Sequence, residues 1–183
     1  MISSWVVANI LLTFTSGQPI LQRSWEKYAP KDGMFTILFP GTPKVTEQTT
    51  KSQIGEVKVY TATYATSDGN IYMISYSDLP PGATKADNLG SLFEGVREGA
   101  KGKDGTVLED EAVTFEFGSE KYPGHKLELK KKMNEREQLA KLWVIVSDNR
   151  LYQIWVIGKG VDKNSFAKSK DATKFLNSFE LTK

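Results

Sequence analysis

The chain has no cysteine and only one histidine among its 183 residues. Without cysteine it can form no disulfide, no thiolate metal site and no catalytic thiol, and no lipid can be attached at an N-terminal cysteine. A histidine-rich zinc site is excluded, and a Ser-His-Asp triad would have to use His125. The Gly-x-Ser-x-Gly sequence that presents many serine nucleophiles is also missing. The sequence therefore predicts no metal, no cofactor and no recognisable catalytic centre.

An excess of charge of one sign is missing as well. Lysine and arginine total 24, aspartate and glutamate total 22, and the formal net charge is +2. A balance of this kind predicts no strong attraction to nucleic acid or to an anionic membrane. Hydrophobic residues make up 39% of the chain. This is enough for a sizeable core, and the length matches one domain of about 100–200 residues.

The first part of the chain differs from the rest. Met1 to Pro19 contains no charged side chain, and Trp5 to Phe14 is an apolar run. Secretory signals have an apolar core of about 7–15 residues followed by small residues at the cleavage site. Thr15, Ser16 and Gly17 supply such residues before Gln18. The pattern predicts a signal peptide.

Together these features predict a signal peptide over residues 1–17, a lead-in segment over 18–33 and a single domain over 34–183. Other interpretations remain open because no lysine or arginine lies near Met1, where a signal peptide usually has one. The segment also suits a buried first strand or helix, or a start that has clipped a longer signal. It is shorter than the ~20 residues that an uncleaved membrane anchor requires. We expect no stable membrane span after processing.

Most of the chain carries strand patterns. Alternating runs rich in β-branched and aromatic residues predict strands. These runs cover 35–39, 45–54, 56–64, 71–78, 107–117, 126–133, 139–147 and 151–158. Asp148 and Asn149 form a two-residue hairpin turn between the last two, which are apolar enough to be covered on both faces.

Two segments carry helical patterns instead. A stripe of apolar residues at helical spacing predicts a helix over 84–101, and a second helix is expected from Phe166 to Phe179. Gly90, Gly95 and Gly99 are expected to let the first helix lie close to the sheet. The prediction is an α+β fold, an α/β/α sandwich with a central, mainly antiparallel sheet flanked by helices.

Four short segments carry a resemblance. They are the opening Phe35-Thr-Ile-Leu-Phe-Pro-Gly-Thr-Pro43, the middle Tyr122-Pro-Gly124, the strand Arg150-Leu-Tyr152-Gln and the ending Phe175-Leu-Asn-Ser-Phe179. In these the chain resembles the PsbP-like family, which includes the extrinsic photosystem II protein and many uncharacterised exported bacterial proteins. The resemblance implies an α/β/α sandwich around an antiparallel sheet. The resemblance identifies no metal-binding or docking residue in this sequence.

Two constellations come closest to known chemistry. Ser165-x-x-Lys168 and Ser147-Asp-Asn149 copy two elements of penicillin-binding enzymes, but in the wrong order and without Lys-Thr-Gly. Glu109, Asp110 and Glu111 could offer oxygen ligands, yet the calcium-loop spacing is absent. In a strand Glu109 and Glu111 share one face and Asp110 lies on the other, which favours a solvated face.

Five residues are the candidates for binding a partner. Lys130, Lys131, Lys132 and Arg136 form a basic hairpin tip that could dock an acidic partner, although such lysines more often protect a sheet edge against aggregation. Trp25 lies outside the expected elements and is the aromatic residue expected to be partly exposed.

We expect an exported, non-catalytic accessory or binding protein in the periplasm, lumen or exterior, whose partner is another protein or a small ligand and not nucleic acid. The alternatives are a cytosolic adaptor of the same fold, with the N-terminal segment folded in, and a carboxylate-based hydrolase.

Overall fold

A computed structural model describes residues 24–52, 55–133, 136–160 and 165–182. The predicted signal peptide lies outside these residues. The elements in chain order are β1 (Glu26–Tyr28), β2 (Phe35–Phe39), β3 (Lys44–Ser52), β4 (Gly55–Ala65), β5 (Ile71–Asp78), α1 (Ala86–Lys101), β6 (Thr106–Phe117), β7 (Glu120–Met133), β8 (Arg136–Ser147), β9 (Arg150–Lys159), the 3-10 helix η1 (Phe166–Lys168), α2 (Lys170–Asn177) and β10 (Glu180–Leu181).

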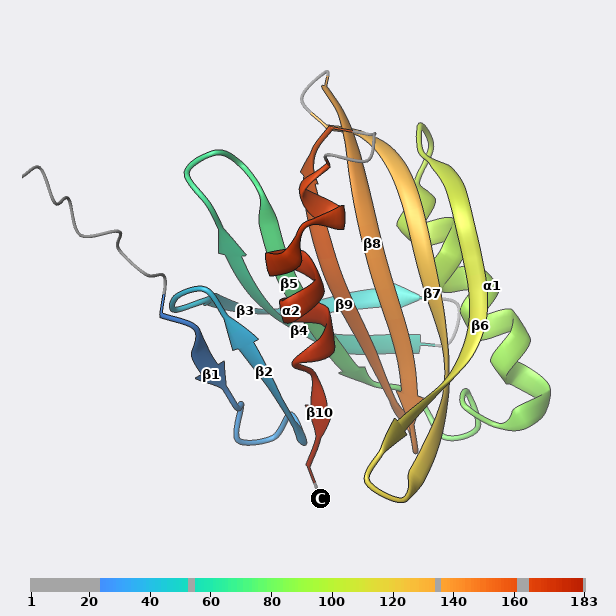
Figure 1. The fold of residues 1–183 in the computed structure, drawn as a ribbon. Helices are drawn as coiled ribbons and strands as arrows, with labels where there is room; N and C mark the ends of the chain where they lie inside the picture. Colours follow the sequence, from blue (N-terminus) through green and yellow to red (C-terminus); the bar gives the residue numbers. More distant parts are fainter. Residues whose placement is uncertain (1–23, 53–54, 134–135, 161–164, 183) are drawn as a thin grey trace, which may run out of the picture.

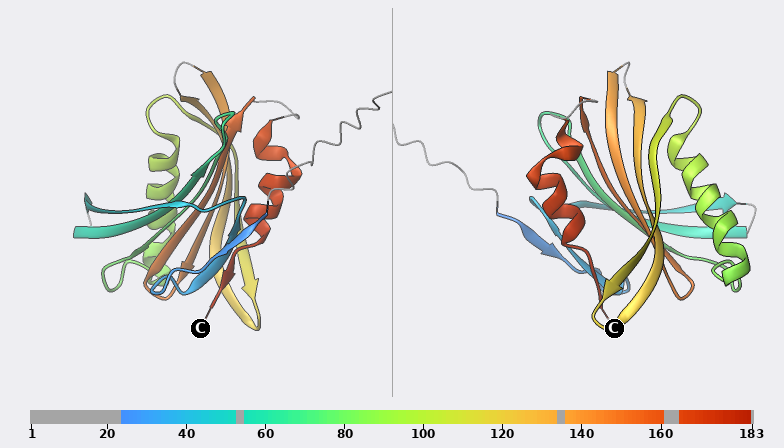
Figure 2. Two further views of the ribbon diagram at one scale, coloured as in Figure 1. Left: turned by 90° about the vertical axis from the view of Figure 1, so that its left-hand side faces the viewer. Right: turned by 45° about the vertical axis from the view of Figure 1, so that its right-hand side comes forward.

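Seven strands form one antiparallel sheet in the order β3-β4-β5-β9-β8-β7-β6. Helix α1 covers one face of the sheet, and η1 and α2 cover the other (Figures 1 and 2). The predicted α+β sandwich is therefore confirmed. A small sheet, β1-β2-β10, lies on the α2 side and was not expected, because β1 is only three residues long and falls in the predicted lead-in segment.

The most apolar part of the chain forms the middle of the sheet, as predicted. Strands β8 and β9 join through Asp148, whose φ of 52° is the left-handed conformation that the hairpin requires. Side chains of β8 and β9 are buried on both faces. Leu142 and Val144 face the α1 side, whereas Ile145 and Ile154 face the α2 side.

Helix α1 uses the predicted apolar stripe. Ala100 is buried, and Leu89, Phe93 and Val96 pack against the α1-side core while remaining partly exposed. The expectation for the helix glycines is wrong. Gly90, Gly95 and Gly99 are exposed, and a Cβ atom at any of them would meet nothing within 4 Å. These glycines face solvent, so they do not bring the helix close to the sheet.

The C-terminal segment does not form the one continuous helix that was expected. It divides into η1 and α2 at Ser169, where the backbone is extended with ψ at 163°. The Ser169 hydroxyl accepts a hydrogen bond of 3.1 Å from the Ala172 N–H, which satisfies one of the free donors at the start of α2. The chain then leaves α2 at Ser178, and Phe179 returns to the core before β10.

Candidate binding groove

The α2 side of the sheet is covered unevenly. Over β4, β5 and β9, the side chains of β2 and α2 complete a closed aromatic core in which Phe35, Phe39, Tyr72 and Phe175 are at most 1% exposed. Strands β6, β7 and β8 are covered less completely: η1 packs on β8 and its Lys168 reaches Glu128 of β7, while one edge of α2 and β10 lie beside the rest. The surface between α2–β10 and these three strands is called the groove below.

Two hollows make up the groove. The hollow beside α2 has a volume of about 270 Å³. Its lining residues are Glu109, Glu111, Lys126, Leu127, Glu128, Lys141, Trp143, Thr173, Leu176 and Asn177. The hollow beside β10 has a volume of about 460 Å³. Its lining residues are Met34, Asp78, Phe117, Glu120, Tyr122, Ser147, Asp148, Asn149, Arg150, Tyr152, Leu181 and Thr182.

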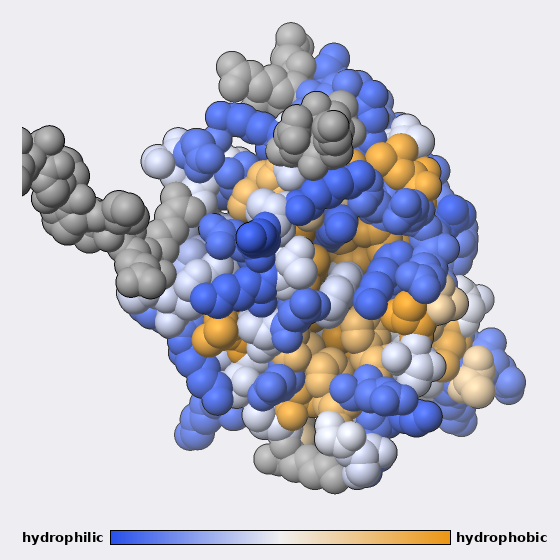
Figure 3. Space-filling view, viewed as in Figure 1, coloured by the Kyte–Doolittle hydropathy of each residue, from blue (hydrophilic) through white to orange (hydrophobic). Residues whose placement is uncertain are grey.

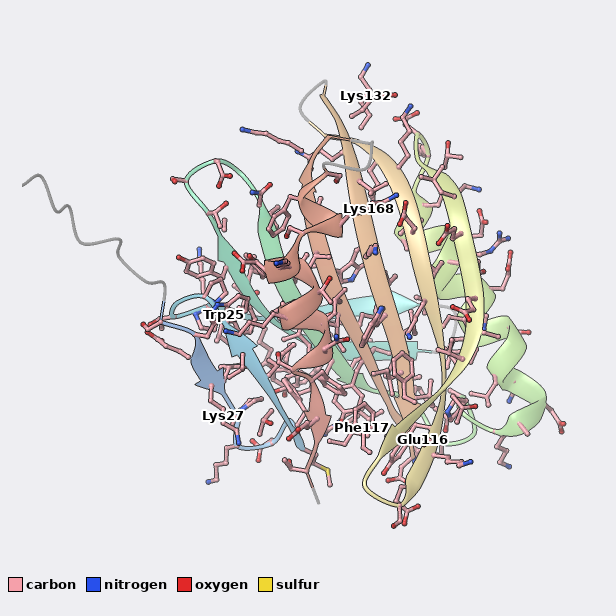
Figure 4. The ribbon with its side chains drawn as sticks, viewed as in Figure 1. Trp25, Lys27, Glu116, Phe117, Lys132 and Lys168 are labelled. Atoms are coloured by element: carbon pink, nitrogen blue, oxygen red, sulfur yellow. The ribbon has the colours of Figure 1, made fainter. Side chains whose placement is uncertain are left out.

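A row of aromatic rings connects the two hollows. The ring centroid of Trp143 lies 5.3 Å from that of Phe115, Phe115 lies 6.3 Å from Phe117, and Phe117 lies 5.8 Å from Tyr122. In Figure 3 apolar residues form a band on this face, bordered by hydrophilic residues. Phe117 lies near β10 at one end of the band (Figure 4). The groove therefore has an aromatic floor and a polar rim.

The absence of a side chain at Gly124 makes this floor possible. Gly124 lies on β7 opposite Val113 of β6. A Cβ atom there would lie 2.6 Å from the Phe115 ring and 2.2 Å from the Val144 carbonyl oxygen. The Phe115 ring thus occupies the space that any other residue at position 124 would need.

The cations of the groove already have partners. Arg150 donates two hydrogen bonds, of 2.6 and 2.8 Å, to the Asp78 carboxylate, and these lower the pKa of Asp78. Arg150 also donates to the Asp32 carbonyl oxygen, which ties β9 to the segment before β2. Lys126 places its Nζ 4.7 Å from the centroid of the Trp143 ring, in a cation–π contact.

The carboxylates divide into paired and unpaired groups. Glu128 is only 8% exposed and forms an ion pair of 3.0 Å with Lys168, with Lys141 at 3.9 Å. Glu109, Glu111 and Asp148 form no hydrogen bond or ion pair within the part of the chain that the structure describes. The strand alternation predicted for the acidic run is confirmed, because Glu109 and Glu111 line the groove.

Asp110 lies on the opposite face, beside α1. Its Oδ1 lies 2.6 Å from Nδ1 of His125, and the His125 ring is 4.4 Å from that of Phe93 on the helix. Arg97 of α1 places its Nε 3.9 Å from Asp110. Sequence reasoning identified no partner for His125. The contact was missed because it joins adjacent strands and a helix, and its only sequence signal was the alternation along β6.

The lysines of the basic hairpin do not form one patch. Lys130 pairs with Glu137 at 2.5 Å, and Lys132 is exposed near the end of β7 (Figure 4). Lys131 lies on the α1 side, where its ammonium donates to the Ala100 carbonyl oxygen at 2.5 Å and burial lowers its pKa. Arg136 begins β8, and its side chain lies outside the description. Partner binding by these residues stays a prediction.

Protection of a sheet edge does not account for all of these lysines. Strand β7 lies inside the sheet, and Lys130 is paired with Thr106 of β6. Its ion pair and the contact of Lys131 with the end of α1 are structural roles. The ion pair joins the two strands of the β7–β8 hairpin, whereas the contact of Lys131 joins β7 to a helix residue 31 positions earlier.

Trp25 is partly buried on the other side of α2, away from the groove (Figure 4). Its ring meets that of Tyr72 edge-on at 5.9 Å, and Lys174 Nζ lies 4.5 Å from its centroid. The expected partial exposure of Trp25 is confirmed. Its use in binding a partner stays a prediction.

The resemblance to penicillin-binding enzymes has no geometric basis. Ser147 lies at the turn before β9, whereas Ser165 follows the other end of β9 and is buried. Lys168 is engaged by Glu128. Among residues 24–52, 55–133, 136–160 and 165–182, no group of three or more acidic or histidine side chains could hold a metal ion. Within the same ranges no helix has the length and apolarity to cross a bilayer.

No protein-family model and no curated protein matches the chain. Several solved structures resemble it. A protein from Bacteroides thetaiotaomicron has 13% identity and a TM-score of 0.47, with 86% of this chain covered. This chain spans about half of that protein, 48% of its length.

The Ran-binding protein Mog1p from Saccharomyces cerevisiae has 8% identity and a TM-score of 0.44, with 87% of this chain and 96% of that chain covered. A Pseudomonas aeruginosa protein of unknown function, described as a putative regulator, has 8% identity and a TM-score of 0.36. The match covers 76% of this chain and 85% of that chain.

Proposed function

We propose that this chain is an exported, non-catalytic binding protein of the PsbP-like type and that the groove holds its partner. One observation carries the proposal. In the aromatic row beside α2 and β10, Phe115 is buried, but Trp143, Phe117 and Tyr122 stay partly exposed and line the two hollows. Concave surfaces with apolar lining and a few polar groups are the usual form of binding sites.

The charged groups of the groove support binding rather than catalysis. The buried carboxylate, Glu128, is held in an ion pair with Lys168, and Arg150 is held by Asp78. Both cations therefore fix the shape of the site. A carboxylate-based hydrolase would need a pair of carboxyl groups that act on one bond from opposite sides. Glu109 and Glu111 instead project side by side from one strand.

The four segments that carry the PsbP-like resemblance meet at one end of the groove. Tyr122, Arg150 and Tyr152 line the hollow beside β10. Phe35 and Phe179 pack behind it, with ring centroids 5.7 and 5.4 Å from that of Tyr152. This convergence supports the family assignment as part of the proposal.

Export is tested by the intact mass and N-terminal sequence of the protein purified from each fraction of its own host. We expect a chain that starts near Gln18 in the exported fraction. A chain that starts at Met1 in the cytosol would contradict the proposal and favour the adaptor.

Use of the groove is tested by photo-crosslinking in intact host cells. A photoreactive phenylalanine analogue replaces Thr173, an exposed residue of α2 that lines the groove. The matched control places it at Lys58, an exposed residue of β4 that lines neither hollow and forms an ion pair with Glu47. We expect one adduct of defined mass from position 173 and none from position 58. Adducts from position 58 alone, or from both positions equally, would contradict the proposal.

A further inference from the structure

We propose that the occupant of the groove is an extended, basic segment of another protein. Its lysine or arginine side chains would lie against Glu109 and Glu111, with their aliphatic stems beside Trp143. This inference rests on the proposed function and names the chemistry of the partner.

The first argument is the sign of the local charge. The lining of the two hollows includes six carboxylates, Asp78, Glu109, Glu111, Glu120, Glu128 and Asp148, but only three cations, Lys126, Lys141 and Arg150. The whole chain carries a formal charge of +2. An acidic groove on a slightly basic protein is complementary to a cationic partner and repels an anionic one.

The second argument is which carboxylates remain available. Arg150 is satisfied by Asp78, and Glu128 is satisfied by Lys168. Glu109 and Glu111 are exposed on the rim with no ion pair to any described residue. Charges that are already paired add little to a new contact, so recognition falls to the unpaired carboxylates, of which Glu109 and Glu111 lie together on β6 in the hollow that contains Trp143.

The third argument is spacing. Glu109 and Glu111 are two residues apart on one strand, so their side chains project from the same face about 7 Å apart. An extended peptide places alternate side chains at the same repeat. A segment with cations at positions i and i+2 would therefore meet both carboxylates at once. In a helix, residues i and i+2 lie on different faces, so the same two carboxylates would instead need cations three or four residues apart.

The floor suits the stems of such side chains. Lys126 already shows the contact, with its ammonium 4.7 Å from the Trp143 ring and 5.6 Å from Phe115. An apolar residue further along the segment would reach Phe117 and Tyr122 in the larger hollow. Long basic side chains bury their methylene groups in this way while the charged head stays at the polar rim.

The test is fluorescence anisotropy with the folded protein and two labelled peptides. One peptide has two lysines in an i, i+2 arrangement followed by a phenylalanine, and the other has glutamates in place of the lysines. We expect saturable binding of the lysine peptide only, weakening as salt is raised because the contacts are between exposed charges.

The variant pair is Glu109→Gln with Glu111→Gln, compared with Glu116→Gln. Glu116 lies on the same strand but outside both hollows, paired with Lys121. We expect the double variant to bind the lysine peptide about tenfold or more weakly, which is the effect of about 1.4 kcal/mol. The control should bind as the parent does. All three proteins should unfold at similar urea concentrations, since the substituted side chains are exposed.

The inference is overturned if both peptides bind equally, if neither binds, or if the two variants weaken binding alike. Its failure differs from failure of the proposed function. A crosslink from position 173 to an acidic or neutral segment of a partner would support the proposed binding function. It would contradict only the inference that the bound segment is basic.

Discussion

The two halves of the α2 side both contain aromatic side chains but cover them to different extents. Over β4, β5 and β9, Phe39 and Phe175 close over Tyr72 until nothing of these rings is exposed. Over β6 to β8, Trp143, Phe117 and Tyr122 stay partly exposed. The difference lies in the second layer, because β2 and α2 close over the first half, whereas one edge of α2 lies beside the second. Aromatic surface left open stabilises the fold less, and remains available for a partner.

The largest expected effect separates the two halves directly. Phe175→Ala removes a ring that is 0% exposed and lies 5.0 Å from Phe39 and 5.2 Å from Tyr72. We expect a loss of about 3–5 kcal/mol in the free energy of unfolding, because a buried cavity is created. Trp143→Ala in the open half should cost only about 1–2 kcal/mol, because part of its ring is already in water.

Urea unfolding of both variants gives the comparison, provided that their m-values match that of the parent. Equal losses from the two substitutions would mean that the groove floor is as tightly packed as the covered core. The distinction between the halves would then be wrong.

A smaller loss is expected from adding one methyl group under the groove floor. In Gly124→Ala the new Cβ would lie 2.6 Å from the Phe115 ring and 2.2 Å from a backbone oxygen. We expect about 1–3 kcal/mol of destabilisation from overpacking. Near-UV circular dichroism should also change, because the Phe115 ring must move beside Trp143.

Gly124→Ala combined with Phe115→Ala is the matching control. Removing the ring relieves one of the two close contacts, so the double variant should lose less than the sum of the two single variants. Simple additivity would show that the ring and the glycine do not share the space.

The strands could be predicted from the sequence because their patterns are local. Alternation placed Glu109 and Glu111 on one face of β6 and Asp110 on the other. Helical spacing located α1 for the same reason. Strand β1 was missed because three residues carry no usable period, and its only partner, β2, lies about ten residues further along the chain.

The groove could not be predicted in the same way. It forms where β6 to β8 meet α2 and β10, so that Trp143 and Leu176 come together from distant parts of the chain. The sequence did place Phe115 and Phe117 on one face, and the same alternation extends to Glu109 and Glu111. No local pattern indicates which part of that face β2, α2 and β10 leave uncovered.

The loss of folding stability at alkaline pH is a second test of the covered half. Burial raises the pKa of Tyr76 to about 12, above its ordinary value near 10. As the pH rises, Tyr76 therefore loses its hydroxyl proton at a lower pH in the unfolded chain than in the folded protein. The stabilisation from neutral Tyr76 is complete below pH 10 and is lost as the pH rises from about 10 to about 12.

Tyr76→Phe should reduce this loss of stability, measured as the change in urea midpoint between pH 9 and pH 11. Tyr122→Phe makes the same substitution at a partly exposed tyrosine of the open half and is the control. If the urea midpoint falls equally between pH 9 and pH 11 in Tyr76→Phe and in the parent, other groups cause the loss of stability at alkaline pH.

The smallest expected effects are in helix α1, which lies outside both halves of the α2 side. They provide a reference for the larger effects. Gly95→Ala and Gly99→Ala put methyl groups on the solvent side of α1, where no atom lies within 4 Å of the new Cβ. Each should stabilise the protein by about 0.5–1 kcal/mol, because glycine in a helix costs conformational entropy. Thermal unfolding should shift upward by about 2–4 °C per kcal/mol for a domain of this size.

Gly102→Ala, just after α1, has the same open surroundings but a φ of 66°, so it should destabilise. If Gly95→Ala and Gly99→Ala also destabilise, that side of the helix is in contact with something, and α1 rather than the groove would then be the face to search for a partner.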